Sequence, residues 1–102
     1  MQYQLDQLKN QIIGKYKPEK IIIFGSRARA DHKQDSDLDL LVIKKTELAR
    51  RQRQQVLREI LRETRKNIDL DILVYTPEEI KKYQNSAFLR TILKEGKILY
   101  ER

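Results

Sequence analysis

The sequence predicts a single α+β domain in which a small β-sheet is backed by helices. The chain has 102 residues, 39% of them hydrophobic, which suits one domain with a modest core. Short apolar runs alternate with amphipathic segments in the order helix, strand, strand, helix, strand, helix, helix, strand. We therefore expect residues 1–102 to form one domain, with sheet and helices packed as a single pair of layers.

The first predicted elements are a helix and a strand. The helix is indicated by apolar residues three and four positions apart: Leu5, Leu8 and Ile12. It is expected to end at Gly14, and Pro18 then breaks the chain. The β-branched run 21–24 predicts a buried strand that stops at Gly25-Ser26.

A second strand over 38–43 and a third over 68–75 are predicted on either side of a long helix. Thr46 is the expected cap of this helix, which extends to about Lys66. Its inner face is expected to carry the apolar positions Leu48, Val56, Leu57, Ile60 and Leu61.

The last third of the chain predicts two short helices and a closing strand. Thr76-Pro77-Glu78-Glu79 is a strong helix start, with a hydroxyl cap, proline at the first position and glutamate three residues after the cap. Ser86 is expected to begin a final helix that ends at Gly96. The run 98–100 then forms a short strand.

The charge is strongly positive and unevenly spread. There are 22 Lys+Arg against 15 Asp+Glu, for a formal net charge of +7, and no cysteine. Nine of the cations and three glutamates lie within 44–66. Six of the seven aspartates lie in two patches, within 31–39 and 69–71. This distribution indicates an acidic centre in a cationic shell, a field that attracts phosphates and divalent metal.

The sequence also excludes several classes of protein. Without cysteine there are no disulfides, thiolate metal sites or thiol nucleophiles. The longest apolar runs have about four residues, too short to span a bilayer. The polar start MQYQLDQLKN is unlike a secretory signal, so a cytoplasmic location is expected.

The alternation of side chains along the strands places the aspartates together. Asp37 and Asp39 share one face of the second strand, and Asp69 and Asp71 share one face of the third. If the two strands are neighbours, these faces lie side by side on the open side of the sheet. Such a set of oxygen ligands suits two divalent ions about 3.5–4 Å apart.

The Gly25-Ser26 pair adds a site for phosphate. Glycine has no Cβ and permits close approach, while the following backbone N–H groups and the Ser26 hydroxyl are able to hold phosphate oxygens. The combination of Gly25-Ser26, ten further residues and then Asp37-x-Asp39 is more specific than either motif alone.

This combination, with Asp71 on a later strand, resembles the nucleotidyltransferase superfamily of the DNA polymerase beta type. The segments FGSRAR (24–29), DSDLDLLV (35–42) and DILVYTPEE (71–79) look closest to its minimal members. The resemblance covers residues 18 to 102, and one departure is Ala30, where the family often has glycine. It implies a palm-like mixed sheet backed by helices.

The resemblance also implies a reaction: transfer of AMP from ATP to a hydroxyl, with release of pyrophosphate and with two Mg²⁺ ions. Asp37 and Asp39 would hold both ions, and Asp71 would complete the coordination of the ion nearer the attacking hydroxyl. Gly25 and Ser26 would contact the triphosphate.

Three residues leave alternatives open. Arg27 and Arg29 are within reach of the triphosphate, but either is equally able to remain solvated. Asp69 is the rival of Asp71 for the role of third acid. Asp71 is preferred because the aliphatic, valine and tyrosine residues after it match the family pattern.

The acceptor is expected to come from a partner, because the chain is short for a transferase core and a substrate-reading domain together. Small members of the family resemble the antitoxin of a toxin–antitoxin pair, whose partner is a helical HEPN-type ribonuclease modified on a tyrosine hydroxyl. The neighbouring gene would then encode that toxin, and a hetero-complex or homo-oligomer is plausible.

Two alternatives belong to other functional classes. In the first alternative, the protein is a nucleotide-binding antitoxin that acts by contact without turnover. In the second, it is a basic nucleic-acid-binding protein that uses the 44–66 segment. The first is disfavoured by the intact set of acids, and the second by the lack of a helix-turn-helix or aromatic stacking cluster.

Overall fold

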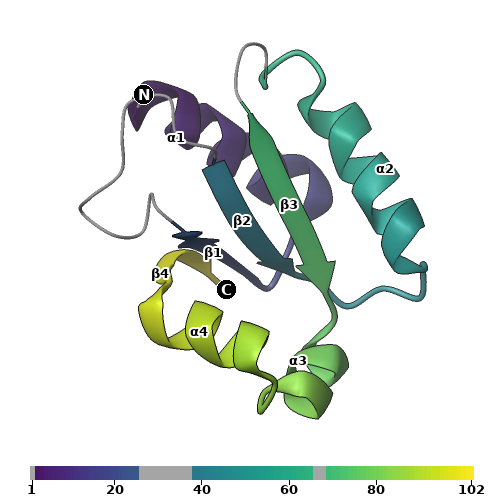
Figure 1. Ribbon diagram of the computed structural model, residues 1–102. Coiled ribbons are helices and arrows are strands. Elements are labelled where there is room, and N and C mark those ends of the chain that lie inside the picture. The colour runs from purple at the N-terminus through teal and green to yellow at the C-terminus, as the bar shows by residue number, and fades with distance from the viewer. Residues whose placement is uncertain (1, 26–37, 66–68) are drawn as a thin grey trace.

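A four-stranded mixed sheet runs through the structure, a computed structural model that describes residues 2–25, 38–65 and 69–102 (Figure 1). The strands lie in the order β3-β2-β1-β4. Their bounds are β1 Lys20–Phe24, β2 Leu38–Ile43, β3 Leu70–Tyr75 and β4 Lys97–Glu101. β1 pairs antiparallel with β2 and β4, whereas β2 and β3 are parallel. The α+β class and the mixed sheet are thus confirmed, while the predicted strand start at Ile68 lies outside the described residues.

The helices follow the predicted order. They are α1 Gln2–Gln11, the π-helix η1 Ile12–Tyr16, α2 Arg50–Leu61, α3 Pro77–Tyr83 and α4 Ala87–Glu95. α3 has the predicted capping box: the Thr76 hydroxyl accepts from the Glu79 N–H at 3.1 Å, and the Glu79 carboxylate accepts from the Thr76 N–H at 2.8 Å. α4 is capped by Ser86 and stops at Gly96, also as predicted.

The predicted end of the first helix at Gly14 is wrong. The chain continues through Gly14 as η1, and the Lys17 N–H donates to the Ile12 carbonyl at 3.2 Å. Lys17 adopts the left-handed conformation, with φ 53°, just before Pro18. The additional turn buries Tyr16 against the sheet, and this burial outweighs the tendency of glycine to end a helix.

The larger core lies between one face of the sheet and α1, η1 and α2. On β2 it contains the alternate residues Leu38, Leu40 and Val42, as the sequence predicts. The helices contribute the fully or almost fully buried side chains Leu8, Ile12, Leu57 and Leu61. Each buried side chain of this size contributes about 1.5–3 kcal/mol, so this face holds the helical layer on the sheet.

The opposite face of the sheet also carries helices, so the expected single pair of layers is wrong. Leu41 of β2 and Tyr75 of β3 pack with Leu89 and Ile92 of α4. Figure 1 shows α3 and α4 near the carboxyl ends of β2 and β3. Along β3, this face changes from exposed at Asp71 to buried at Tyr75. Within the described residues, the aspartate face is therefore open where β2 and β3 begin.

The helix α2 is shorter than predicted, and its buried face matches the prediction only in part. It begins at Arg50 after Ala49, while the Thr46 hydroxyl accepts from the Leu48 N–H in the preceding loop at 3.2 Å. Of the five predicted inner positions, Leu57 and Leu61 are buried and Ile60 is partly buried, but Leu48 and Val56 are exposed. The predicted helix end at Lys66 lies outside the described residues, and α2 itself ends at Leu61.

A buried arginine, Arg53, lies on the inner face of α2 together with Leu57 and Leu61. Arg53 is 6% exposed, and its side chain donates to the carbonyls of Leu48 at 2.6 Å and Val74 at 3.1 Å. It also forms a two-pronged ion pair with Glu79, at 2.8 and 3.3 Å. One guanidinium group therefore joins α2, the end of β3 and the first turn of α3.

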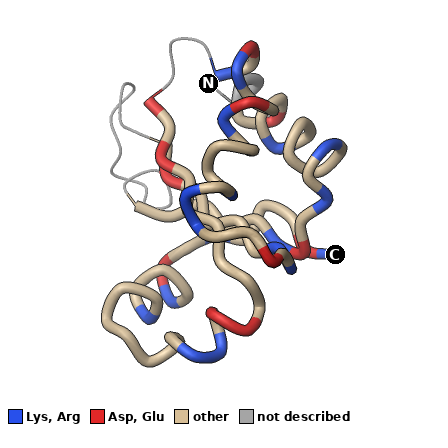
Figure 2. The backbone as a smooth tube through the Cα atoms, turned by 90° about the vertical axis from the view of Figure 1, so that its right-hand side faces the viewer, with Lys and Arg blue, Asp and Glu red and all other residues tan. Residues whose placement is uncertain are grey.

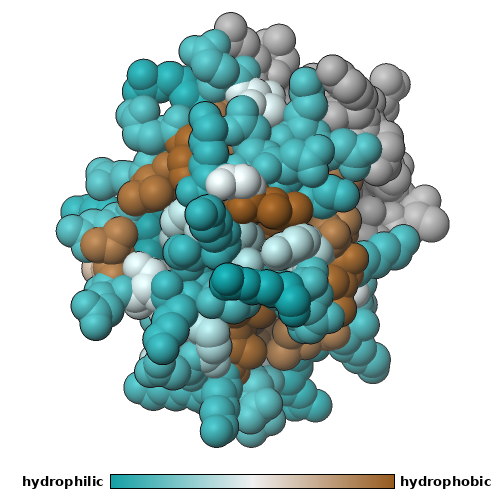
Figure 3. Space-filling view, turned by 180° about the vertical axis from the view of Figure 1, so that it is seen from behind, coloured by the Kyte–Doolittle hydropathy of each residue, from teal (hydrophilic) through white to brown (hydrophobic). Residues whose placement is uncertain are grey.

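Several large apolar side chains of the described residues are exposed, among them Val56 of α2, Leu93 of α4 and Ile98 of β4. Figure 3, seen from behind, shows hydrophobic areas among hydrophilic side chains. Among the described helices, none is long and apolar enough to cross a membrane. Phe88 of α4 is 50% exposed, and its position beside the candidate site is described below.

The Arg53–Glu79 pair predicts a specific dependence of stability on pH. The Arg53 hydrogen bonds hold the pKa of the Glu79 carboxyl below its ordinary value. The stabilisation is therefore complete above the unfolded-state pKa, about 4.3, and is lost as the pH falls through the lower folded-state pKa. We expect Glu79→Gln to cost about 1 kcal/mol at pH 7, since a charged hydrogen bond becomes a neutral one.

Urea unfolding between pH 7 and pH 3 measures this difference. The difference in free energy of unfolding between wild type and Glu79→Gln should become smaller as the pH falls. Glu78→Gln is the matched control, because Glu78 is exposed one position earlier, and it should change the free energy of unfolding by no more than about 0.5 kcal/mol. A gap that stays constant over this range would contradict the prediction.

Candidate functional site

Two aspartates lie side by side on the parallel strands β2 and β3. Asp39 and Asp71 are Cα partners in the sheet register, and their side chains point to the same face. Asp39 is half-buried and Asp71 is exposed. Figure 2 shows acidic segments on the part of the sheet beside the grey trace, and further acidic segments among the basic ones on the helices and loops. The predicted juxtaposition of these two carboxylates is confirmed.

A third strand, β1, lies on the other side of β2 and ends directly beside Asp39. Phe24 is the Cα partner of Asp39, so Phe24, Asp39 and Asp71 form one row across three strands. Gly25 follows with φ 75°, in the left-handed region. A Cβ at Gly25 would overlap the Asp39 carboxylate, whose Oδ2 lies nearest and whose Cγ would be only 3.3 Å away.

Gly25 is therefore needed for two physical reasons. Its positive φ disfavours residues with a side chain, and its missing side chain leaves the space that the Asp39 carboxylate occupies. The turn after β1 and the acid on β2 are thus fitted to one another. The structure thus shows a close approach of Asp39 to Gly25, and the expected approach of a phosphate to Gly25 stays a prediction.

The chemistry of this pair of acids favours a cation. Neighbouring strands are about 4.8 Å apart, and two carboxylates at such a distance repel by about 1 kcal/mol even in water. Carboxylate oxygens are the ligands that Mg²⁺ prefers. Asp39 and Asp71 therefore fit one side of a divalent-metal site. Among the described residues, no cluster of three acidic or histidine side chains forms a complete one.

Several predicted site residues lie outside the described residues. These are Ser26, Arg27, Arg29 and Asp37. Asp69 is described: it lies just before β3, is exposed, and its carbonyl accepts from the Leu38 N–H at 2.9 Å. The structure thus brings together Gly25, Asp39 and Asp71 of the predicted set.

An apolar hollow adjoins the acids on the side of α4, and sequence analysis missed it. It is lined by Phe24 and Gly25 and by Ala87, Phe88, Thr91, Ile92 and Glu95 of α4. The rings of Phe24 and Phe88 meet edge to face, with centroids 6.3 Å apart. The signal available in the sequence was Phe88 itself, an aromatic residue two positions after the Ser86 cap of a short helix. Its pairing with Phe24 depends on how α4 returns to the sheet.

The chain matches the family model described as "Polymerase beta, Nucleotidyltransferase" over residues 6–102. A comparison with curated proteins gave no match.

Three solved structures share the fold. A candidate nucleotidyltransferase from Sulfolobus solfataricus has a TM-score of 0.71 at 23% identity, covering 100% of this chain and 81% of its own. A toxin–antitoxin structure with AMP-PNP has a TM-score of 0.55 at 20% identity, covering 98% and 73%. A mutant of the toxin–antitoxin MntA–HpeT has a TM-score of 0.56 at 15% identity, covering 95% and 72%.

The fit between Gly25 and Asp39 predicts a large difference between two glycine substitutions. Gly25→Ala should lower the free energy of unfolding by about 1–2 kcal/mol from the left-handed backbone alone, and further through the overlap with Asp39. Gly14→Ala is the matched control: nothing lies within 4 Å of its Cβ position and its φ is not positive. It should be neutral or stabilising by up to about 1 kcal/mol.

Urea unfolding of these variants, alone and with Asp39→Ala, separates the two causes. Removing the Asp39 carboxylate should reduce the cost of Gly25→Ala to its backbone part. If Gly25→Ala costs the same with and without Asp39, the carboxylate does not occupy the space beside Gly25, and the described fit is wrong.

Proposed function

Since this chain belongs to the polymerase beta nucleotidyltransferase family, we propose that it transfers AMP from ATP to a hydroxyl group of a partner toxin. The acceptor we propose is a tyrosine of a helical HEPN-type protein, and the chain thereby acts as its antitoxin. The observation that carries the proposal is the in-register pair Asp39 and Asp71 beside Gly25.

The proposed step replaces one phosphorus–oxygen bond with another. The acceptor oxygen bonds to the α-phosphorus of ATP, the bond to the bridging oxygen breaks, and pyrophosphate leaves with its electron pair. Two Mg²⁺ ions, when bound, lower the pKa of the acceptor hydroxyl and neutralise charge on the leaving group. Asp37 and Asp39 would hold both ions, while Asp71 would hold the one nearer the acceptor and help remove the hydroxyl proton.

The phosphate chain is assigned to the turn after β1. Gly25 directly follows this strand with positive φ, and it lies against the Asp39 carboxylate. Ser26 and its backbone N–H would bind phosphate oxygens there. Arg27 and Arg29 are proposed to offset the charge of the triphosphate.

The choice of partner is supported by two of the structural neighbours. Both are toxin–antitoxin structures, one of them with AMP-PNP and the other a double Asp-to-Glu mutant. Its two substituted aspartates are two positions apart, the same spacing as Asp37 and Asp39 here. These likenesses suggest the class of partner.

AMP transfer is tested by mixing the protein with ATP, Mg²⁺ and the purified product of the neighbouring reading frame. We expect intact-mass spectrometry to show the gain of one AMP unit on that product and not on the chain itself. Asp37→Ala should abolish the gain. A toxin that is neutralised equally well by Asp37→Ala, with no added mass, would instead support a binding antitoxin without turnover.

The sheet register supports our proposal that Asp71, and not Asp69, is the third acid. Asp71 is the register partner of Asp39, whereas Asp69 precedes the strand. Asp71→Asn should lower the rate of AMP transfer at least about 100-fold, equivalent to about 2.7 kcal/mol of transition-state stabilisation. Asp69→Asn should change it less than about fivefold. The reverse pattern in a single-turnover assay would make Asp69 the third acid.

A further inference from the structure

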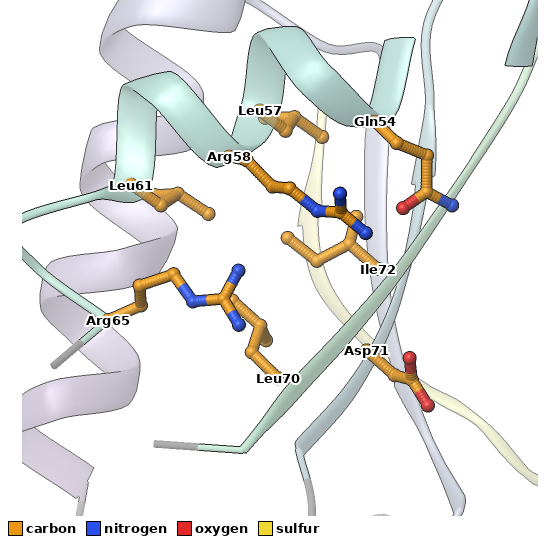
Figure 4. Close-up of a pocket in the computed structure, with 8 residues that line it drawn as sticks. All are labelled: Gln54, Leu57, Arg58, Leu61, Arg65, Leu70, Asp71 and Ile72. Atoms are coloured by element: carbon orange, nitrogen blue, oxygen red, sulfur yellow. The ribbon is translucent and has the colours of Figure 1, made fainter. Parts of the chain in front are cut away.

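Two arginines of the α2 region converge on a small pocket against the edge strand β3. Gln54 and Arg58 are four positions apart on α2, which places them on one face of that helix, and Arg65 lies in the turn after α2. The pocket is lined by these three residues and by Leu57, Leu61, Leu70, Asp71 and Ile72. Figure 4 shows both guanidinium groups extending over Leu70 and Ile72. Two like charges thus share one recess.

Neither guanidinium group has a carboxylate partner among the described residues. Glu59, next to Arg58, is bonded to Arg62 at 2.8 Å. Asp71 lines the pocket, but Figure 4 shows its carboxylate directed away from both arginines. Arg65 is half-buried, so its charge is partly removed from water without compensation within the described chain. A bound anion would relieve both the repulsion and this desolvation.

The pocket favours a carboxylate on an aliphatic stem. Leu57, Leu61, Leu70 and Ile72 provide an apolar floor, which suits methylene groups, while guanidinium groups bind carboxylates in a planar, two-pronged geometry. A nucleic-acid backbone instead requires an extended row of cations. Here Glu59 on α2 and Glu63 in the turn after it interrupt the row of arginines. The observations therefore favour an acidic protein side chain over nucleic acid.

We propose that the Arg58–Arg65 pocket binds an Asp or Glu side chain of the protein that accepts AMP. This inference rests on the proposed function for the identity of that partner. Leu70 and Ile72, which form the floor, flank Asp71 on the same strand. β3 is an edge strand, so no further strand separates the pocket from the aspartate face. A partner anchored here reaches around the edge of β3 to present its hydroxyl to Asp71.

The test is binding of the neighbouring gene product, measured by calorimetry without ATP. We expect the double variant Arg58→Gln, Arg65→Gln to raise Kd at least about tenfold, or about 1.4 kcal/mol. The double variant Arg58→Lys, Arg65→Lys keeps the charge but loses the planar geometry, and should lie between it and wild type. The matched control is Arg51→Gln with Arg90→Gln, which removes the same charge from exposed residues outside the pocket. It should change Kd less than about twofold.

The inference would be overturned if the double Arg58, Arg65 variant bound the gene product with unchanged Kd, or if the control variant lost as much affinity. It would also be overturned if the wild-type protein did not bind the gene product. The same would follow if binding of poly(U) RNA, rather than of the gene product, depended on the two arginines. Thermal unfolding of each variant shows that it is folded.

Because binding is measured without turnover, the two proposals fail separately. Arginine-dependent binding without AMP transfer would refute the proposed reaction and keep the pocket. AMP transfer with arginine-independent binding would refute the pocket and keep the reaction.

Discussion

The parallel pairing of β2 with β3 is the constraint on which the rest of the structure depends. It sets Asp39 beside Asp71 at one end of the pair. Further along the same strands, it buries Leu41 and Val42 on opposite faces, each fully buried. A shift of one residue would turn every side chain of a strand to the wrong face. The two apolar layers therefore fix the register, and the register fixes the acids.

The buried Arg53 side chain is a second constraint, and it acts at the other end of this strand pair. Arg53 reaches from α2 to the Val74 carbonyl and to Glu79, and the same Glu79 carboxylate caps α3. The position of α3 in turn fixes where the chain enters α4, whose Phe88 meets Phe24 beside the acids. A charge buried far from the candidate site thus helps to determine the shape of the hollow next to it.

Sequence reasoning predicted best where local chemistry and tertiary packing agree. The box at Thr76 and Glu79 is completed within one helical turn, and the strand 38–43 is apolar on both faces, so both were predictable. Gly14 and Thr46 carried equally clear local signals that tertiary contacts overrode, namely the burial of Tyr16 and the docking of Arg53. For the same reason, the sequence could place Asp39 and Asp71 on one face but could not reveal that α4 covers part of it.

The way in which β2 and β3 are joined has a consequence for folding. β1 and β2 are antiparallel, whereas β3 reaches β2 only after the chain has passed through α2. Closing a loop of this length costs conformational entropy, which is offset only when the contacts between β2 and β3 form. A nascent or partly folded chain therefore has no paired carboxylates, and it acquires them only when the crossover closes.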